Sequence, residues 1–252
     1  MSEFRPTGFQ MLPGAVKNLI LINALVFLAQ QVLPHTGFNM EDTFALHTLQ
    51  SQLYKPWQLI THLFMHADIM HIALNMLALW IFGSVLENLW GPKRFLTFYI
   101  ICGLGAALCH MALLFYQNQH IINEYAVINR QSPDYFKMLK AFLEKYNMQN
   151  EGYVSEKYAE VVINDNLNIP TIGASGAVFG CLAGFGYLFP NNQLYVYGLF
   201  PIKAKWLVII YAGIEILATV QDDPGDNVAH VAHLGGALAG LIMVYFWNKK
   251  RW

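Results

Sequence analysis

Long apolar stretches alternate with polar connections along the 252-residue chain. In lipid each apolar stretch must satisfy its own backbone hydrogen bonds, so such stretches are expected to be helices. Six of them run over about 15–33, 69–89, 95–116, 175–189, 204–220 and 228–247. The pattern predicts an all-α, polytopic membrane protein built as a bundle of six transmembrane helices.

The fourth stretch is unusually short. A helix from Ser175 to Phe189 rises about 21 Å, whereas the hydrocarbon core of a bilayer is roughly 30 Å thick. The start of this helix should therefore lie below the membrane surface. Unpaired backbone N–H groups and the positive end of the helix dipole would there favour a developing negative charge near Ser175.

The composition supports a membrane protein and narrows its partners. Hydrophobic residues make up 56% of the chain and charged residues 12%, whereas soluble domains are about a quarter charged. A net charge of −1 leaves no basic surface for nucleic acid. We expect Cys102, Cys109 and Cys181 to be buried free thiols, because they are odd in number and lie in apolar stretches.

The charges of the connections predict the orientation. In a six-helix arrangement the two termini and the second and fourth connections lie on the same side of the membrane. These segments carry lysine and arginine at Arg5, Lys17, Lys93, Arg94, Lys203, Lys205, Lys249, Lys250 and Arg251. The connection before the sixth stretch instead carries Asp222, Asp223 and Asp226. By the positive-inside bias both termini are cytoplasmic, and Ser175 opens toward the extracytoplasmic side. With no presequence pattern at the N-terminus, we expect a bacterial cytoplasmic (inner) membrane.

This topology divides the chain into a short cytoplasmic N-terminus (1–14), a membrane domain (15–248) and a short cytoplasmic tail (249–252). Two long extracytoplasmic connections interrupt the membrane domain. The first, 34–68, is rich in aromatic residues and is expected at the membrane interface. The second, 117–171, is a polar insert in which 133–146 has the spacing of a surface helix. We favour a structural elaboration over a role in substrate recognition for this insert.

Two polar residues within the apolar stretches point to chemistry. Ser175 and His233 would be penalised by hydrocarbon unless they had a function, and histidine is the usual base that activates a serine hydroxyl. Small residues recur at every fourth position in both segments, at Gly176, Gly180 and Gly184 and at Gly236 and Gly240. Such stripes let helix backbones approach closely, which would bring Ser175 and His233 within reach of each other.

The second stretch adds two hydrogen-bond donors. His71 and Asn75 are four residues apart and share one helix face. An imidazole N–H and an amide can stabilise the oxyanion of an acyl-transfer intermediate. Ordinary hydrogen bonding between helices is the alternative, and it is the more common one for such a pair alone. His62, His66 and His71 could also be considered as metal ligands. No acidic residue accompanies them at the spacing of the HExxH motif, so we predict no metal and no cofactor.

The order and spacing of these motifs resemble those of the rhomboid family of intramembrane serine proteases. The resemblance covers about residue 18 to the C-terminus, apart from the long insert. The matching motifs are Gly173-Ala174-Ser175-Gly176, His71 with Asn75, Ala232-His233 with Gly236 and Gly240, Glu87 with Gly91, the Trp57 region, and the spacing of His66 and His71.

The resemblance implies a Ser–His dyad without a third acid, with Ser175 as nucleophile and His233 as general base. It implies oxyanion donors at His71, Asn75 and the backbone N–H of Ser175, and a substrate-binding role for Gly173. The implied substrates are single-pass or polytopic membrane proteins, cut in or near transmembrane segments with small, helix-weakening residues. The fifth helix and the loop before the sixth would form a lateral gate in the lipid bilayer.

Two positions depart from the common pattern of the family. Gln58 follows Trp57, where many bacterial members have arginine, which puts a loop contact in doubt. Phe179 stands one turn after Ser175, where members often have tyrosine. Its ring could still stack under His233, but a hydroxyl contact would be missing.

Two other classes of function stay open on the sequence. The chain could be a catalytically silent relative that binds transmembrane clients, although such relatives typically lack the serine or the histidine. It could be a small-solute transporter, although transporters tend to show repeated halves and no repeat is visible here. Reactivity of Ser175 toward a serine-directed probe would separate a protease from both.

Overall fold

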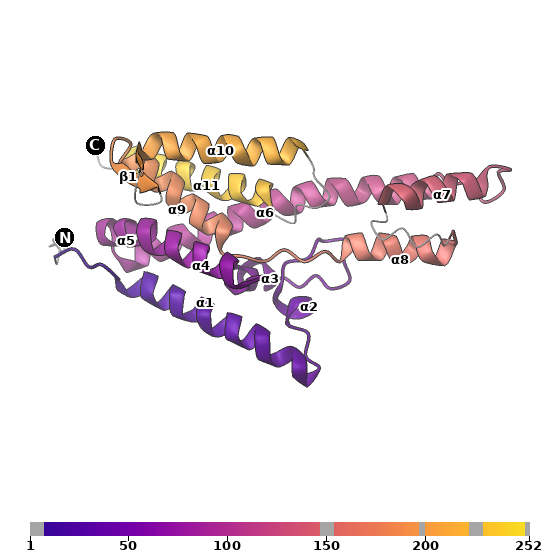
Figure 1. Cartoon of the computed structure of the whole chain (residues 1–252), viewed down its shortest axis with the longest axis horizontal. Helices are drawn as coiled ribbons and strands as arrows, with labels where there is room; N and C mark the ends of the chain where they lie inside the picture. Colours follow the sequence, from indigo (N-terminus) through magenta and orange to yellow (C-terminus); the bar gives the residue numbers. More distant parts are fainter. Residues whose placement is uncertain (1–7, 147–153, 197–199, 222–228, 250–252) are drawn as a thin grey trace.

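The computed structural model describes residues 8–146, 154–196, 200–221 and 229–249. Within them the chain forms a helical bundle with one small β-hairpin (Figure 1). The long elements are α1 (Gly14–Val32), the continuous run α4 (Ile69–Ala78), η3 (Leu79–Gly83) and α5 (Ser84–Trp90), α6 (Pro92–Ala126), α9 (Ser175–Leu188), α10 (Ala204–Gln221) and α11 (His230–Lys249). The shorter ones are η1 (Leu33–Thr36), α2 (Met40–Phe44), α3 (Gln58–Thr61), η2 (His62–Phe64), α7 (Tyr135–Tyr146), α8 (Glu156–Leu167), and the antiparallel strands β1 (Gln193–Val196) and β2 (Phe200–Lys203).

The predicted all-α, polytopic class is confirmed. Each of the six apolar stretches forms a helix, and in the described part of the chain five helical segments are long and apolar enough to cross a membrane. The remaining helix, α9, forms the fourth apolar stretch. It has 14 residues and is as short as the sequence indicates. Because α9 alone is too short to establish a crossing by its length, the count of six transmembrane helices stays a prediction.

One boundary was predicted wrongly. The third apolar stretch was expected to end near residue 116, but α6 continues to Ala126. On this extension Ile121 is buried because the end of α6 packs against α7 and α8, and Asn118 is buried where it donates a hydrogen bond to Oγ1 of Thr48 at 3.4 Å. The three helices share a small apolar cluster made of Ile121, Leu139, Phe142, Leu143, Ala159 and Val162. The helix predicted within 133–146 is therefore present, and it helps to build a helical extension at the far end of α6 (Figure 1).

Helix α9 occupies the middle of the bundle. Ten of its 14 residues are buried, and it packs against α6 and α11. By contrast, α10 turns large apolar side chains such as Ile214 and Leu217 outward, as expected of a helix that faces lipid. The short helix that begins at Ser175 is therefore enclosed by protein.

Glycines allow α9 and α11 to touch through their backbones. A Cβ atom at Gly236 would lie 1.9 Å from the carbonyl oxygen of Gly176, and one at Gly240 would lie 2.7 Å from that of Gly180. Both distances are shorter than van der Waals contact, so no larger residue fits without a shift of the backbone. The predicted close crossing of the two glycine stripes is confirmed.

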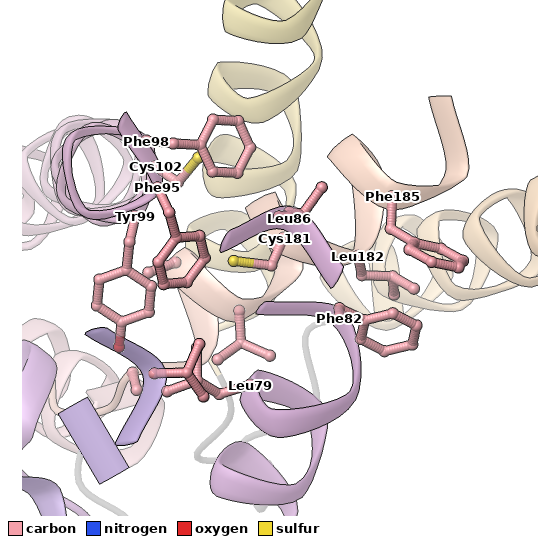
Figure 2. Close-up of a cluster of buried hydrophobic side chains, with 14 of the residues drawn as sticks. Leu79, Phe82, Leu86, Phe95, Phe98, Tyr99, Cys102, Cys181, Leu182 and Phe185 are labelled. Atoms are coloured by element: carbon pink, nitrogen blue, oxygen red, sulfur yellow. The ribbon is translucent and has the colours of Figure 1, made fainter. Parts of the chain in front are cut away.

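An apolar cluster joins α9 to η3, α5 and α6 (Figure 2). It includes Phe95, Phe98 and Tyr99 from α6, which are fully covered. The three cysteines are free thiols, as predicted. Cys102 and Cys181 are buried in this cluster, whereas Cys109 is only partly buried, so the prediction of burial is correct for two of the three.

The connection 34–68 is folded around one buried side chain. Gln58 has no exposed surface, and its Oε1 accepts hydrogen bonds from the backbone N–H groups of His47 (3.3 Å) and Lys55 (3.0 Å). Its Nε2 donates to the carbonyl oxygens of Asp42 (3.2 Å) and Leu53 (2.9 Å). Gln58 thus links several parts of this connection, since its amide supplies both donors and an acceptor.

Several residues behind the predicted orientation lie outside the described residues. They are Arg5, Lys250, Arg251 and the acidic Asp222, Asp223 and Asp226. The placement of both termini in the cytoplasm and the division into cytoplasmic and extracytoplasmic segments stay predictions.

The backbone contact of α9 with α11 can be tested by adding one methyl group. Gly236→Ala should lower the free energy of unfolding by at least about 1–3 kcal/mol, because the added carbon overpacks the crossing. Gly213→Ala in α10 is the matched control, since nothing lies within 4 Å of its added Cβ. It should be neutral or stabilise by about 0.5–1 kcal/mol. Unfolding in detergent micelles measures both, and equal stability of the two variants would contradict the close crossing.

Candidate active site

Ser175 is the first residue of α9 and follows a glycine with a positive φ angle. Gly173 has φ +129°, a conformation that other residues rarely adopt. Its N–H donates to the carbonyl oxygen of His62 at 2.9 Å, and Thr171 just before it pairs with Leu46. These bonds fix the segment that leads into α9. No side chain caps this end of the helix, so its first N–H groups are available to a ligand.

His71 lies beside Gly173 and Ser175. A Cβ atom placed on Gly173 would lie 3.0 Å from both Cε1 and Nε2 of His71, and 3.4 Å from Oγ of Ser175. The other ring nitrogen, Nδ1, accepts a hydrogen bond from the N–H of Ala67 at 3.3 Å. A neutral imidazole carries one proton, so this bond leaves the proton on Nε2. His71 therefore presents an N–H donor on the side of Gly173.

The start of α4 fixes His71 in this place. Asp68 caps the helix by accepting a hydrogen bond from the N–H of His71 at 2.8 Å. Asn75, one turn later, is 6% exposed, and its Nδ2 donates to the carbonyl oxygen of His71 at 3.0 Å. The amide has a second N–H, so its predicted role as an oxyanion donor stays a prediction.

His233 is held on the face of α9 that carries Ser175. Its ring stacks on Phe179 with a centroid distance of 4.2 Å and an interplanar angle of 4°. Phe179 is four residues after Ser175, so the two side chains project from the same face of α9. His233 also interacts electrostatically with His71. The predicted stacking of phenylalanine under the histidine is confirmed, and the structure gathers Ser175, His71 and His233 at one end of α9.

Two further residues of this region were missed at the sequence level. Glu215 of α10 lies with Oε1 3.0 Å from Nδ1 of His233 and with Oε2 2.5 Å from Nδ1 of His230. The signal was present in the sequence, because Glu215 is an acid within an apolar stretch and His230 precedes His233 by three positions on one helix.

The same three residues are the possible metal ligands of the site. Among the described residues, Glu215, His230 and His233 form the one group of three whose ligand atoms all lie within 4.8 Å of one another. Two imidazoles and a carboxylate form a ligand set that zinc accepts. The trio His62, His66 and His71, considered from the sequence, does not form such a group among those residues.

The two histidines before α4 are buried and neutral. Burial lowers the pKa of His62 to about 4, against which a hydrogen bond to the Gln58 carbonyl acts weakly. Burial also lowers the pKa of His66 to about 4, with a further contribution from nearby His71. Both rings therefore serve the site as uncharged groups at neutral pH.

The fold and the site define a class of protein: a polytopic helical membrane protein with a serine at a buried helix start and a histidine on a neighbouring helix. A family model described as the Rhomboid domain matches residues 54–128 and 137–250. The chain belongs to the rhomboid family.

Known relatives agree with this assignment. The chain is 27% identical to RHOMBOID-like protein 12, mitochondrial, of Arabidopsis thaliana, over 94% of this chain and 58% of that protein. It is 25% identical to Rhomboid protein 1, mitochondrial, of Saccharomyces cerevisiae, over 74% of this chain and 40% of that protein. It is 23% identical to Rhomboid protease GluP of Bacillus subtilis, over 73% of this chain and 24% of that protein. The chain thus spans no more than about three fifths of each of these relatives.

The buried histidine predicts a pH dependence of stability. The pKa of His62 is about 4 in the folded protein against 6.5 for an unperturbed histidine, so the imidazole takes up its proton at a higher pH in the unfolded chain than in the folded one. The free energy of unfolding should be highest above about pH 6.5, and His62 alone should lower it by up to about 3 kcal/mol toward pH 4.

Unfolding in detergent at a series of pH values measures this effect. His62→Asn should reduce the pH dependence by the contribution of one histidine, because His66, whose pKa is also lowered to about 4, still titrates, whereas His35→Asn, at an exposed position, should leave it unchanged. The same slope in the wild type and in His62→Asn would show that His62 is not the titrating group.

Proposed function

We propose that this chain is an intramembrane serine endopeptidase that hydrolyses peptide bonds in or near transmembrane segments of membrane proteins. The observation that carries the proposal is the convergence on one end of α9. Oγ of Ser175 and the ring of His71 both lie within 3.4 Å of the place that a Cβ atom on Gly173 would take, and His233 stacks on Phe179 of the same helix face. Family membership supports a protease of this kind.

In this mechanism Oγ of Ser175 attacks the carbonyl carbon of the scissile bond. Nε2 of His233 takes the hydroxyl proton and later gives it to the leaving amine, so that an acyl-enzyme remains on Ser175. A water molecule, deprotonated by the same nitrogen, then attacks the acyl-enzyme and releases the second product. No step requires a cofactor.

The oxyanion that forms in both steps needs donors. The N–H of Ser175 is among the unpaired groups at the start of α9, Nε2 of His71 carries a proton, and the amide of Asn75 has a spare N–H. The helix dipole adds to the stabilisation of the negative charge. Gly173 lies between the serine and His71, where it would contact the substrate backbone.

Substrates would be single-pass or polytopic membrane proteins that reach the site from the lipid bilayer. A hydrogen-bonded helix does not offer its carbonyls in extended form, so the substrate segment must unwind locally, which small and helix-weakening residues favour. Helix α10 would form part of the lateral gate. Its outward apolar surface and its few buried residues, Ala204 and Glu215, suit a helix that can move.

The helices indicate an integral membrane protein. Several relatives carry mitochondrial or chloroplastic names, and they give no support to the expectation of a bacterial inner membrane. The compartment assigned to this chain is therefore limited to a lipid bilayer.

Replacement of the nucleophile tests the proposal directly. Ser175→Ala should abolish cleavage and labelling by a fluorophosphonate, and His233→Ala should do the same because the hydroxyl loses its base. Ser132→Ala in the insert is the control and should be labelled like the wild type. Labelling of purified protein in detergent or liposomes, followed by cleavage of a transmembrane substrate, measures both. No labelling of the folded wild type by a probe shown to enter the site would instead indicate a client-binding protein or a transporter.

Asn75→Ala tests the oxyanion donors. The variant should lower kcat by about 10- to 1,000-fold, the range for loss of one such donor. Asn23→Ala is the matched control, because Nδ2 of this buried asparagine also donates to the carbonyl four residues earlier, at 2.8 Å, in α1. An equal loss of turnover in both variants would place Asn75 in a packing role.

A further inference from the structure

One carboxylate points into the bundle from the helix that otherwise faces outward. Glu215 is 6% exposed, whereas its neighbours Ile214 and Ile216 are 53% and 52% exposed. A charged side chain within a membrane segment is costly and persists where it has partners and a function. The groups that the Glu215 carboxylate contacts should therefore explain why it points into the bundle.

The partners of Glu215 are two histidines on α11. Nδ1 of His233 lies 3.0 Å from Oε1, and Nδ1 of His230 lies 2.5 Å from Oε2. Each carboxylate oxygen thus faces one ring. Nδ1 of His233 lies within ion-pair distance of Oε1, but the pair does not meet the geometry of a hydrogen bond, so the carboxylate or the ring must turn to form one.

We propose that Glu215 is a positioning residue that orients His233 as the general base, an inference that rests on the proposed function. A neutral imidazole has one proton for two nitrogens. A carboxylate at Nδ1 holds that proton there, which leaves Nε2 as the acceptor for the hydroxyl proton of Ser175. The same negative charge stabilises the imidazolium that forms after the transfer, as the acid of a serine-protease triad does.

Two other contacts support this role. Phe179 holds the plane of the His233 ring by stacking, and His230 occupies the second oxygen of Glu215, which keeps the carboxylate in place. His71 and His110 also interact electrostatically with His233, but neither supplies a negative charge. Among the described residues, Glu215 is the one carboxylate within ion-pair distance of His233.

This arrangement differs from the dyad without a third acid that the family resemblance implies. It also joins two helices, because Glu215 lies on α10 and both histidines lie on α11. If α10 opens as a gate, the carboxylate moves away from His233 with it. The orientation of the base would then depend on the position of α10.

Kinetics of Glu215→Gln give the first test. Removing the charge should lower kcat by about 10- to 100-fold while KM changes less than about twofold, a smaller loss than removal of a general base. Fluorophosphonate labelling of Ser175 should slow in parallel, and Glu215→Asp should recover part of the rate. Glu160→Gln, the same substitution at an exposed position of α8, is the control and should keep wild-type kinetics. Wild-type kcat in Glu215→Gln, or a change in KM alone, would overturn the inference.

The second test does not need activity. Nitrogen-15 spectra of the histidine rings are recorded in the Ser175→Ala background, with the His233 signals assigned from a Ser175→Ala/His233→Gln sample. His233 should carry its proton on Nδ1 when Glu215 is present, and the proton should move toward Nε2 in Glu215→Met. An unchanged tautomer would overturn the inference. Failure of the wild type to cleave or to be labelled would refute the proposed function instead, so the two failures are distinguishable.

A metal ion bound by Glu215, His230 and His233 is the competing explanation for their proximity. It predicts that a chelator stops cleavage, whereas the positioning role predicts no effect. Wild-type cleavage is measured in EDTA and after addition of Zn²⁺. Undiminished cleavage in EDTA supports a hydrogen-bonded carboxylate. Cleavage that disappears in EDTA and returns with Zn²⁺ would make Glu215, His230 and His233 a metal site and would overturn the positioning role.

Discussion

The direct backbone contact between α9 and α11 is the constraint on which the rest of the site depends. With Gly176 facing Gly236 and Gly180 facing Gly240, the axes of the two helices come closer than any other residue would permit. At that separation the ring of His233 lies flat on Phe179. Ser175 and His233 are 58 positions apart in the sequence. The close packing that the glycines allow brings the helices that carry them together.

The start of α9 needs a second support, which the connection 34–68 supplies. Non-helical backbone at membrane depth is tolerated only where protein or water surrounds it. The pairing of Leu46 with Thr171 and the bond from Gly173 to His62 tie the segment before α9 to this connection. Gln58 in turn holds the connection together. Through these bonds the loop determines where the open end of α9 lies.

The buried carboxylates Glu87 of α5 and Glu215 of α10 have different roles. Glu87 of α5 accepts hydrogen bonds from the N–H groups of Ala15 and Val16, both at 2.8 Å, and so caps the start of α1 with a side chain from another helix. Glu215 faces ring nitrogens that can gain or lose a proton. The first carboxylate stabilises the fold, whereas the second lies where it can affect chemistry.

The sequence alone determined the presence of six apolar helices, the shortness of α9, and the candidate residues Ser175, His233, His71 and Asn75. These features are local, because hydrophobic length, glycine spacing and the rarity of polar residues in apolar stretches are written along the chain. The extension of α6 to Ala126 was missed because its sequence is largely polar, and the packing of Ile121 against α7 and α8 is not visible in any local pattern. The role of Gln58 as the centre of a loop was likewise hidden. Only the tertiary structure brought Glu215 of α10 against His230 and His233 of α11. The contact depends on how the two helices are rotated toward each other, and an apolar helix does not encode that rotation in its own sequence.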